Sequence, residues 1–168
     1  MKKLFLATLS ALLLLSTFFG GSVSTATAKG PKVLKFNSMV GVPAGLIGDL
    51  SLPALRGIRG GGVPWIIGEA SGELRANGHL EITVQGLVLA TTGSNPSATF
   101  QGLVSCVNSS GGFEKILTGA FPATTGLASE GGGNAEIVAD LILPQPCIAP
   151  IIFVTNGAGT SWFASTGL

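Results

Sequence analysis

The chain has 168 residues, and only 10% of them are charged. Its nine Lys and Arg residues balance eight Asp and Glu residues, and no basic cluster follows the first three residues. We therefore expect no nucleic-acid partner, because phosphate backbones are bound by clustered Lys and Arg. The 26 glycines, together with many β-branched residues, favour an all-β domain with many turns.

The first 28 residues have the three parts of a secretory signal peptide. A short basic start (Lys2 and Lys3) precedes a leucine-rich apolar stretch over 4–19, and the small residues Ala-Thr-Ala occupy 26–28. The alternative is an uncleaved membrane anchor, but the apolar stretch is short for a span of about 20 residues. We expect cleavage near Ala28.

The remaining residues, 29–168, are enough for one domain with a sizeable core. They contain no further apolar run of membrane length, so we expect no transmembrane span in the mature chain. No cysteine follows the apolar stretch of the leader, which excludes a lipoprotein anchor there. The form of the leader indicates a bacterial protein that is secreted or otherwise extracytoplasmic.

The mature chain begins with a predicted strand over 32–40. Residues 41–64 are rich in Gly and Pro and have no clean period, which predicts an irregular segment that crosses the end of the fold over tucked Leu and Ile side chains. Short helical turns around 44–56 are an alternative, although Pro53 limits any helix.

A hairpin is predicted over residues 70–76 and 79–90. Asn77-Gly78 between the two runs favours a type I′ turn, which needs positive φ at both residues. Along the second run, apolar residues alternate with polar ones, so one face is expected to be buried and the other wet. The buried set is Leu80, Ile82 and Val84, and the wet set is Glu81, Thr83 and Gln85. Gly86 interrupts the alternation and predicts a bulge.

Further strands are separated by Gly-, Asn- and Ser-rich turns and by a long loop over 122–133. The predicted strands are 97–108, 113–121, 134–143, 151–156 and 160–166, the last two joined at Asn156-Gly157. No amphipathic helix lies between the strands, which disfavours a parallel α/β fold. The sequence therefore predicts a single all-β domain, either an antiparallel β-sandwich or a Greek-key barrel.

The two cysteines, Cys106 and Cys147, lie in strand-like apolar segments of an exported chain, so we expect a disulfide between them. The alternative is two buried free thiols. Two cysteines without a nearby His cannot complete a zinc site, and we expect no metal and no cofactor. Pro144, Pro146 and Pro150 predict that the stretch around Cys147 lies at a sheet edge or in a crossing between sheets.

Candidate catalytic groups are sparse. The one histidine, His79, is a possible general base, and a Ser-His-Asp site would have to combine it with Asp49 or Asp140, but no G-x-S-x-G elbow is present. Glu73 and Glu81 flank the predicted hairpin turn as possible cross-strand neighbours, so a paired-carboxylate hydrolase is an alternative. The simpler interpretation is a set of polar residues on an exposed strand face, with no catalytic residue.

Two further features have both a functional and a structural interpretation. Trp65 and Trp162 are a possible platform for a sugar or peptide ligand, or else buried parts of the core and its rim. The Gly-rich stretches at 59–65 and 131–136 lack the Lys-Ser/Thr ending and the following helix of a phosphate loop. We interpret these stretches as turns.

The chain resembles an uncharacterised family of exported bacterial single-domain β proteins. The resemblance covers most of residues 40–167 and is carried by GGGVPW, GLVL, the SC and PC cysteine contexts, and the terminal WFASTG. It implies one exported β domain, and it implies no activity and no catalytic residue.

Together these features favour a non-enzymatic secreted or cell-envelope module with a structural or binding role. Its partner would be an envelope component, a polysaccharide or a protein. The alternative is a small secreted hydrolase that uses the carboxylates Glu73 and Glu81 or the lone His79. A third hypothesis is self-assembly into an outer coat, which the low charge favours.

Overall fold

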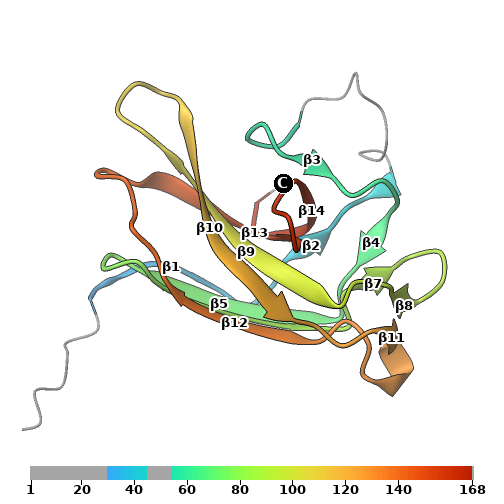
Figure 1. Ribbon diagram of the computed structural model, residues 1–168. Coiled ribbons are helices and arrows are strands. Elements are labelled where there is room, and N and C mark those ends of the chain that lie inside the picture. The colour runs from blue at the N-terminus through green and yellow to red at the C-terminus, as the bar shows by residue number, and fades with distance from the viewer. Residues whose placement is uncertain (1–29, 45–53, 168) are drawn as a thin grey trace, which may run out of the picture.

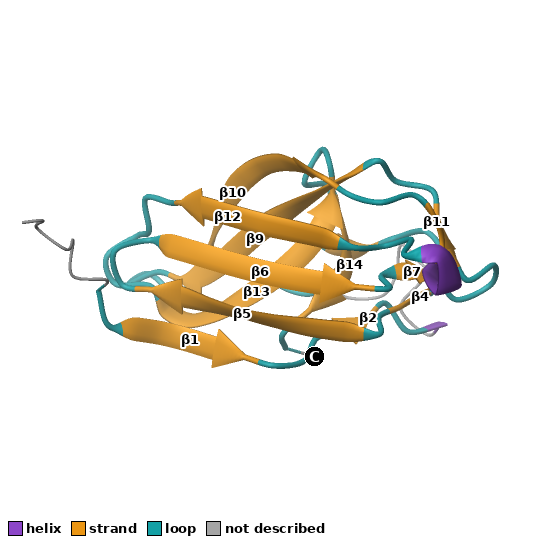
Figure 2. Ribbon diagram, turned by 90° about the horizontal axis from the view of Figure 1, so that it is seen from below, coloured by secondary structure: helices purple, strands orange, loops and turns teal. Residues whose placement is uncertain are grey.

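The computed structural model describes residues 30–44 and 54–167 and shows a β-sandwich, as predicted (Figures 1 and 2). The predicted signal peptide at 1–28 and most of the possible helical turns at 44–56 lie outside the described residues. Sheet A has the order β1-β5-β6-β12, in which every neighbouring pair is antiparallel. Its strands are β1 (Lys32–Phe36), β5 (Glu69–Arg75), β6 (His79–Gln85) and β12 (Ala135–Asp140).

Sheet B has the order β10-β9-β13-β14-β2, and β3 adds to β14 in parallel. Its strands are β10 (Phe113–Pro122), β9 (Thr99–Val107), β13 (Ile148–Asn156), β14 (Ser161–Ser165), β2 (Val40–Gly41) and β3 (Arg59–Gly60). Figure 1 shows that sheet B curls strongly, whereas sheet A is a flatter layer beneath it.

Two short ribbons close one end of the sandwich, opposite the turn between β5 and β6 (Figure 1). They pair β4 (Trp65–Ile66) with β7 (Val88–Leu89), and β8 (Ser94–Asn95) with β11 (Gly126–Leu127). The predicted loop at 122–133 therefore contains a short strand, and a 3₁₀ turn, η2 (Ala128–Glu130), follows it.

The main core lies between the inner faces of the two sheets. A Cβ added to Gly102 of β9 would lie 3.2 Å from Ile82 and 3.3 Å from Ile137, which places sheet A directly against sheet B. The residues predicted to face inward in the second hairpin strand are buried, as expected from their period of two. The fully buried inner residues include Leu74, Leu80, Ile82, Val84 and Ile137 of sheet A, and Phe100, Val104, Cys106, Ile152 and Val154 of sheet B.

Sheet B also buries much of its other face. Along β9 every residue from Phe100 to Cys106 is buried, so both sides of this strand are covered. Part of the cover is the segment 54–58, which precedes β3. The Arg56 guanidinium lies 4.9 Å from the centre of the Phe113 ring and donates to the Ala149 carbonyl at 2.9 Å. Leu55 and Ile58 are buried or half-buried, which agrees with the prediction of tucked apolar side chains.

The predicted hairpin is confirmed, but its turn differs from the predicted type. Only Gly78 has positive φ, at 89°, and its N–H donates to the Arg75 carbonyl at 2.9 Å. The loop is therefore the three-residue kind, a turn followed by a left-handed glycine. A Cβ at Gly78 would lie 1.7 Å from the Leu141 carbonyl oxygen, so glycine is needed here for space as well as for φ.

Two predicted strands are shorter than expected. The segment 32–40 divides between β1 in sheet A and β2 in sheet B, because the chain leaves sheet A after Phe36. The segment 79–90 ends as a strand at Gln85, since Gly86 has φ of 65° and redirects the chain toward β7. The expected bulge at Gly86 is thus a strand end.

The disulfide between Cys106 and Cys147 is confirmed, with their Cα atoms 4.9 Å apart. It joins β9 to the residue just before β13. Pro144 and Pro146 lie in the connection from sheet A to sheet B, which confirms the predicted crossing. Of the two predicted alternatives the crossing therefore holds, and β13 itself lies between β9 and β14. Pro150 fits there because the register with β9 is interrupted between Ile148 and Ile151.

Candidate functional site

The outer face of sheet A carries mostly polar side chains, with Val138 as the exception, because alternate residues of its strands point away from the core. Figure 2 views the molecule from this side. The outward residues are Glu69, Ser71, Glu73 and Arg75 of β5, His79, Glu81, Thr83 and Gln85 of β6, and Glu136, Val138 and Asp140 of β12. We call this surface the polar face. It has two ends of different chemistry.

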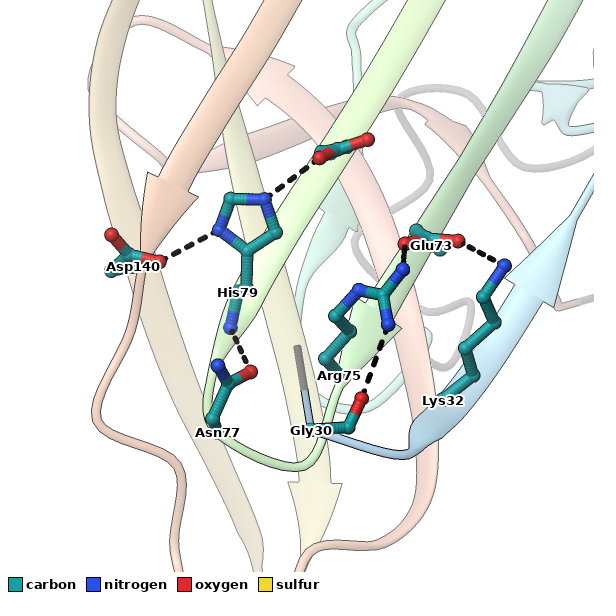
Figure 3. Close-up of polar contacts among 8 residues, drawn as sticks. Gly30, Lys32, Glu73, Arg75, Asn77, His79 and Asp140 are labelled. Carbon is teal, nitrogen blue, oxygen red and sulfur yellow. Dashed lines mark hydrogen bonds and ion pairs between the residues drawn. The ribbon is translucent and has the colours of Figure 1, made fainter. Parts of the chain in front are cut away.

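At the end near the β5–β6 turn, Glu73 is held between two cations (Figure 3). Its carboxylate pairs with Lys32 Nζ at 2.6 Å and with the Arg75 guanidinium. Arg75 also donates to the Gly30 carbonyl at 3.1 Å. The hydrogen bond from Lys32, and then that from Arg75, lowers the pKa of Glu73 despite some desolvation. Glu73 is therefore ionised and neutralised by its neighbours.

His79 lies beside this group and is held between two carboxylates (Figure 3). Its Nδ1 is 2.7 Å from Asp140, and its Nε2 is 2.7 Å from Glu81. The hydrogen bond to Asp140, followed by that to Glu81, raises the pKa of His79. Because both ring nitrogens face acceptors, the arrangement favours the doubly protonated imidazolium.

We call these six side chains the charged cluster: Lys32, Glu73, Arg75, His79, Glu81 and Asp140. The charged cluster does not favour acid–base catalysis. A general base needs a free ring nitrogen, and both nitrogens of His79 are occupied. A general acid needs a carboxyl of raised pKa, and that of Glu73 is lowered. Glu73 and Glu81 do face each other across the hairpin, as predicted, but each carboxylate bonds to a different partner.

The opposite end of the polar face contains a cleft of about 260 Å³ that the sequence analysis did not find. It forms where β1 has left sheet A, so that residues 69–71 of β5 have no neighbour from β1. The lining residues come from three parts of the chain: Asn37, Ser38 and Met39 after β1, Ile67 to Ser71 at the start of β5, and Thr83 and Gln85 on β6.

The cleft has a polar wall and an apolar floor. Asn37 and Gln85 contribute amides, and Ser38, Ser71 and Thr83 contribute hydroxyls. Met39 and Ala70 are buried beneath them, each 7% exposed. The Gly68 N–H donates to the Gln85 carbonyl at 3.1 Å, which extends the β5–β6 ladder into the wall and makes it rigid.

Glu69 is the only charged residue in the lining of this cleft. Glu136 of β12 lies nearby, as the register partner of Thr83 of β6. Within residues 30–44 and 54–167, no Lys or Arg forms an ion pair with Glu69 or with Glu136. This end of the polar face is therefore net negative, whereas the acidic groups of the charged cluster are largely offset by Lys32, Arg75 and His79.

Neither tryptophan forms the exposed platform that the sequence allowed. Trp65 is 5% exposed and Trp162 is 1% exposed. Trp65 stacks on Phe163 with their ring centres 3.9 Å apart, and Trp162 lies 6.1 Å from Phe153 in the covered face of sheet B. Both side chains are part of the core, as the structural interpretation predicted.

Among the described residues, no three His, Cys, Asp or Glu side chains lie together in a group that could hold a metal ion. The same part of the chain contains no helix that is long and apolar enough to cross a membrane. The disulfide is typical of proteins that fold outside the reducing cytoplasm, so it indicates an extracytoplasmic location.

Comparison with protein families, curated proteins and solved structures found no match. The resemblance to exported bacterial β proteins therefore stays a prediction. The assignment of a function depends on the polar face alone, and on the contrast between its charged cluster and its cleft.

Proposed function

We propose that this protein is an exported, non-catalytic binding module that binds its partner through the cleft in the polar face. One observation carries the proposal: five uncharged polar side chains and one carboxylate, Glu69, surround a preformed hollow on a sheet, while the titratable groups at the other end of the polar face are occupied by one another. Small concave sites with a few directed polar groups are typical of ligand binding. The leader, cleaved near Ala28, would deliver the module to the cell envelope or the medium.

The sandwich suits this role, because the paired strands β5 and β6 hold the lining of the cleft in one arrangement without a ligand. A preorganised site loses little conformational entropy on binding. Its acidic character favours a neutral or cationic partner over an anionic one, which fits an envelope polysaccharide better than a nucleic acid.

The test is cosedimentation of the purified secreted protein with bacterial cell-wall sacculi and with insoluble polysaccharides, including chitin and chitosan. Ser71→Tyr fills the cleft without adding charge, and Val138→Tyr adds the same side chain to the same face on β12, outside the cleft. We expect the wild type and Val138→Tyr to sediment with at least one polymer and Ser71→Tyr to stay in the supernatant.

Three results would contradict the proposal. Absence of sedimentation with every polymer would remove the binding role, and equal binding by Ser71→Tyr would place the site elsewhere. Release of soluble fragments from a polymer, lost in the triple variant of His79, Glu73 and Glu81 to glutamine with an unchanged melting temperature, would identify a hydrolase instead.

A further inference from the structure

We propose that the cleft takes one unit of an amine-bearing saccharide, with the ammonium group on Glu69. This inference rests on the proposed function, since it names the ligand class for the same site. It depends on three properties of the cleft: its size, the mixture of polar groups on its wall, and its single unpaired charge.

The size of the cleft favours a ligand of one ring. Pockets for drug-sized molecules are usually about 300–1,000 Å³, and this cleft is about 260 Å³. A longer chain could continue along the exposed row formed by Ser71, Thr83 and Glu136, which are register neighbours across β5, β6 and β12. The cleft would then hold one sugar unit and the row its neighbour.

The wall suits a ligand with several hydroxyl groups. The amides of Asn37 and Gln85 each offer donors and acceptors, and the hydroxyls of Ser38, Ser71 and Thr83 can do either. A sugar ring carries the same dual groups around its edge, and its C–H face can pack on Met39 and Ala70 of the floor.

The charge distinguishes an amine-bearing sugar from a neutral or anionic one. Glu69 is exposed in the lining, and no cation pairs with it among the described residues. An ammonium would form a charge-assisted hydrogen bond with its carboxylate, whereas a carboxylate or sulfate on the ligand would be repelled. Glu73 cannot serve in the same way, because Lys32 and Arg75 already neutralise it.

A lysine side chain of a protein partner would form an ion pair with Glu69 but would bond to few of the other polar groups of the cleft. Its ammonium has three donors and no acceptor, and its stem is aliphatic. The five amide and hydroxyl side chains of the wall would then keep only water as partners. A saccharide uses the whole wall, so we infer a saccharide and treat the lysine peptide as the competing outcome.

The test is a titration of the secreted protein, followed by amide NMR near pH 6, with the glucosamine trimer, the N-acetylglucosamine trimer and trilysine. At this pH the free amine is protonated. We expect the glucosamine trimer to bind at least about tenfold more tightly than the other two, the effect of one charge-assisted hydrogen bond. The shifted amides should include Ser38, Gly68 and Thr83.

Glu69→Gln removes the charge with little change of shape, and we expect it to bind the two trimers equally, about tenfold or more below the wild type for glucosamine. Glu114→Gln is the matched control in β10 of sheet B, and it should bind as the wild type does. Equal binding of both trimers by the wild type, or an unchanged Glu69→Gln, would overturn the amine assignment.

The failure of this inference can be told apart from failure of the proposed function. If both trimers bind equally and Ser71→Tyr abolishes both, the cleft is a saccharide site without amine preference. If trilysine binds as tightly as the glucosamine trimer, the saccharide class is wrong. If neither trimer shifts cleft amides, the inference fails, and the cosedimentation experiment alone then decides whether the face binds a partner.

Discussion

The two sheets present opposite kinds of outer face. On sheet A the outward side chains are polar and reach solvent, whereas on sheet B the outward residues Leu103, Phe153 and Trp162 are each at most 1% exposed. The difference arises because residues 54–58 cover part of the outer face of sheet B, whereas Figure 2 shows no described element over sheet A. One face therefore serves stability, and the other is available for binding.

The polar atoms on the two outer faces also differ. On the outer face of sheet A most of them reach water or one another, and Arg75 Nε is the one buried side-chain atom there without a hydrogen-bond partner among the described residues. On sheet B three buried side-chain atoms, Gln101 Oε1, Ser105 Oγ and Trp162 Nε1, have no hydrogen-bond partner. Such atoms lower stability by about 1–3 kcal/mol each. Apolar burial on sheet B must outweigh this loss, so substitutions there should have the larger effects.

The largest effect on stability is expected when one outward side chain of each sheet is shortened to alanine and the two variants are compared. Phe153→Ala should lower the free energy of unfolding by about 3–5 kcal/mol, because it leaves a cavity under a covered face. Val138→Ala, on the outer face of sheet A at 44% exposure, should change it by less than about 1 kcal/mol. Urea unfolding followed by tryptophan fluorescence measures both, and equal effects would contradict the contrast.

The next effect concerns the disulfide, which lies in sheet B only. Replacing Cys106 and Cys147 by alanine should lower the free energy of unfolding by about 2–4 kcal/mol, because the bond closes a long loop in the unfolded chain. A reductant should move the urea midpoint of the wild type and leave that of the double variant unchanged. An unchanged wild-type midpoint would show that sheet B does not depend on this bond.

The smallest effect is expected in the charged cluster of sheet A. Because the pKa of His79 is raised in the folded protein, its contribution to stability is fully present below the unfolded pKa of about 6.5 and is lost as the pH rises through the folded value. The free energy of unfolding of the wild type should therefore exceed that of His79→Gln by more at pH 6 than at pH 9. The change between the two pH values should be at most about 1 kcal/mol, because the ion pairs are partly exposed.

Glu73 does not contribute to this difference between pH 6 and pH 9. Its pKa is lowered in the folded protein, so the stability that it contributes is lost only as the pH falls through that folded pKa. A difference that grew toward pH 9 would contradict the imidazolium assignment, and Asp140→Asn should abolish most of the pH dependence.

Local patterns in the sequence were sufficient to predict much of the fold. Alternation identified β6 and β12, Asn77-Gly78 identified the hairpin, and two cysteines in strand-like segments identified the disulfide. The turn type was wrong because the number of loop residues, which sequence composition does not determine, selects between turns. The prolines around Cys147 left open an edge or a crossing, and the crossing holds: Pro144 and Pro146 precede β13, and Pro150 lies where the register of β13 with β9 is interrupted.

The cleft could not be predicted, because it depends on where one strand ends. Asn37 and Ser38 belong to a segment that has the pattern of a single strand, and only the transfer of the chain from sheet A to sheet B places them beside Ser71 and Thr83. His79 was correctly placed near the hairpin turn, but its partner Asp140 lies 61 residues away and is aligned with it only by the register of β6 and β12.

The position of β13 has a consequence for the order in which the protein can be completed. This strand lies between β9 and β14, yet β13 and β14 are the last two strands of the chain. Sheet B therefore cannot be completed until β13 has paired with both β9 and β14. Because β9 and β13 are far apart in the sequence, this pairing is non-local, and sheets that depend on non-local pairing fold slowly.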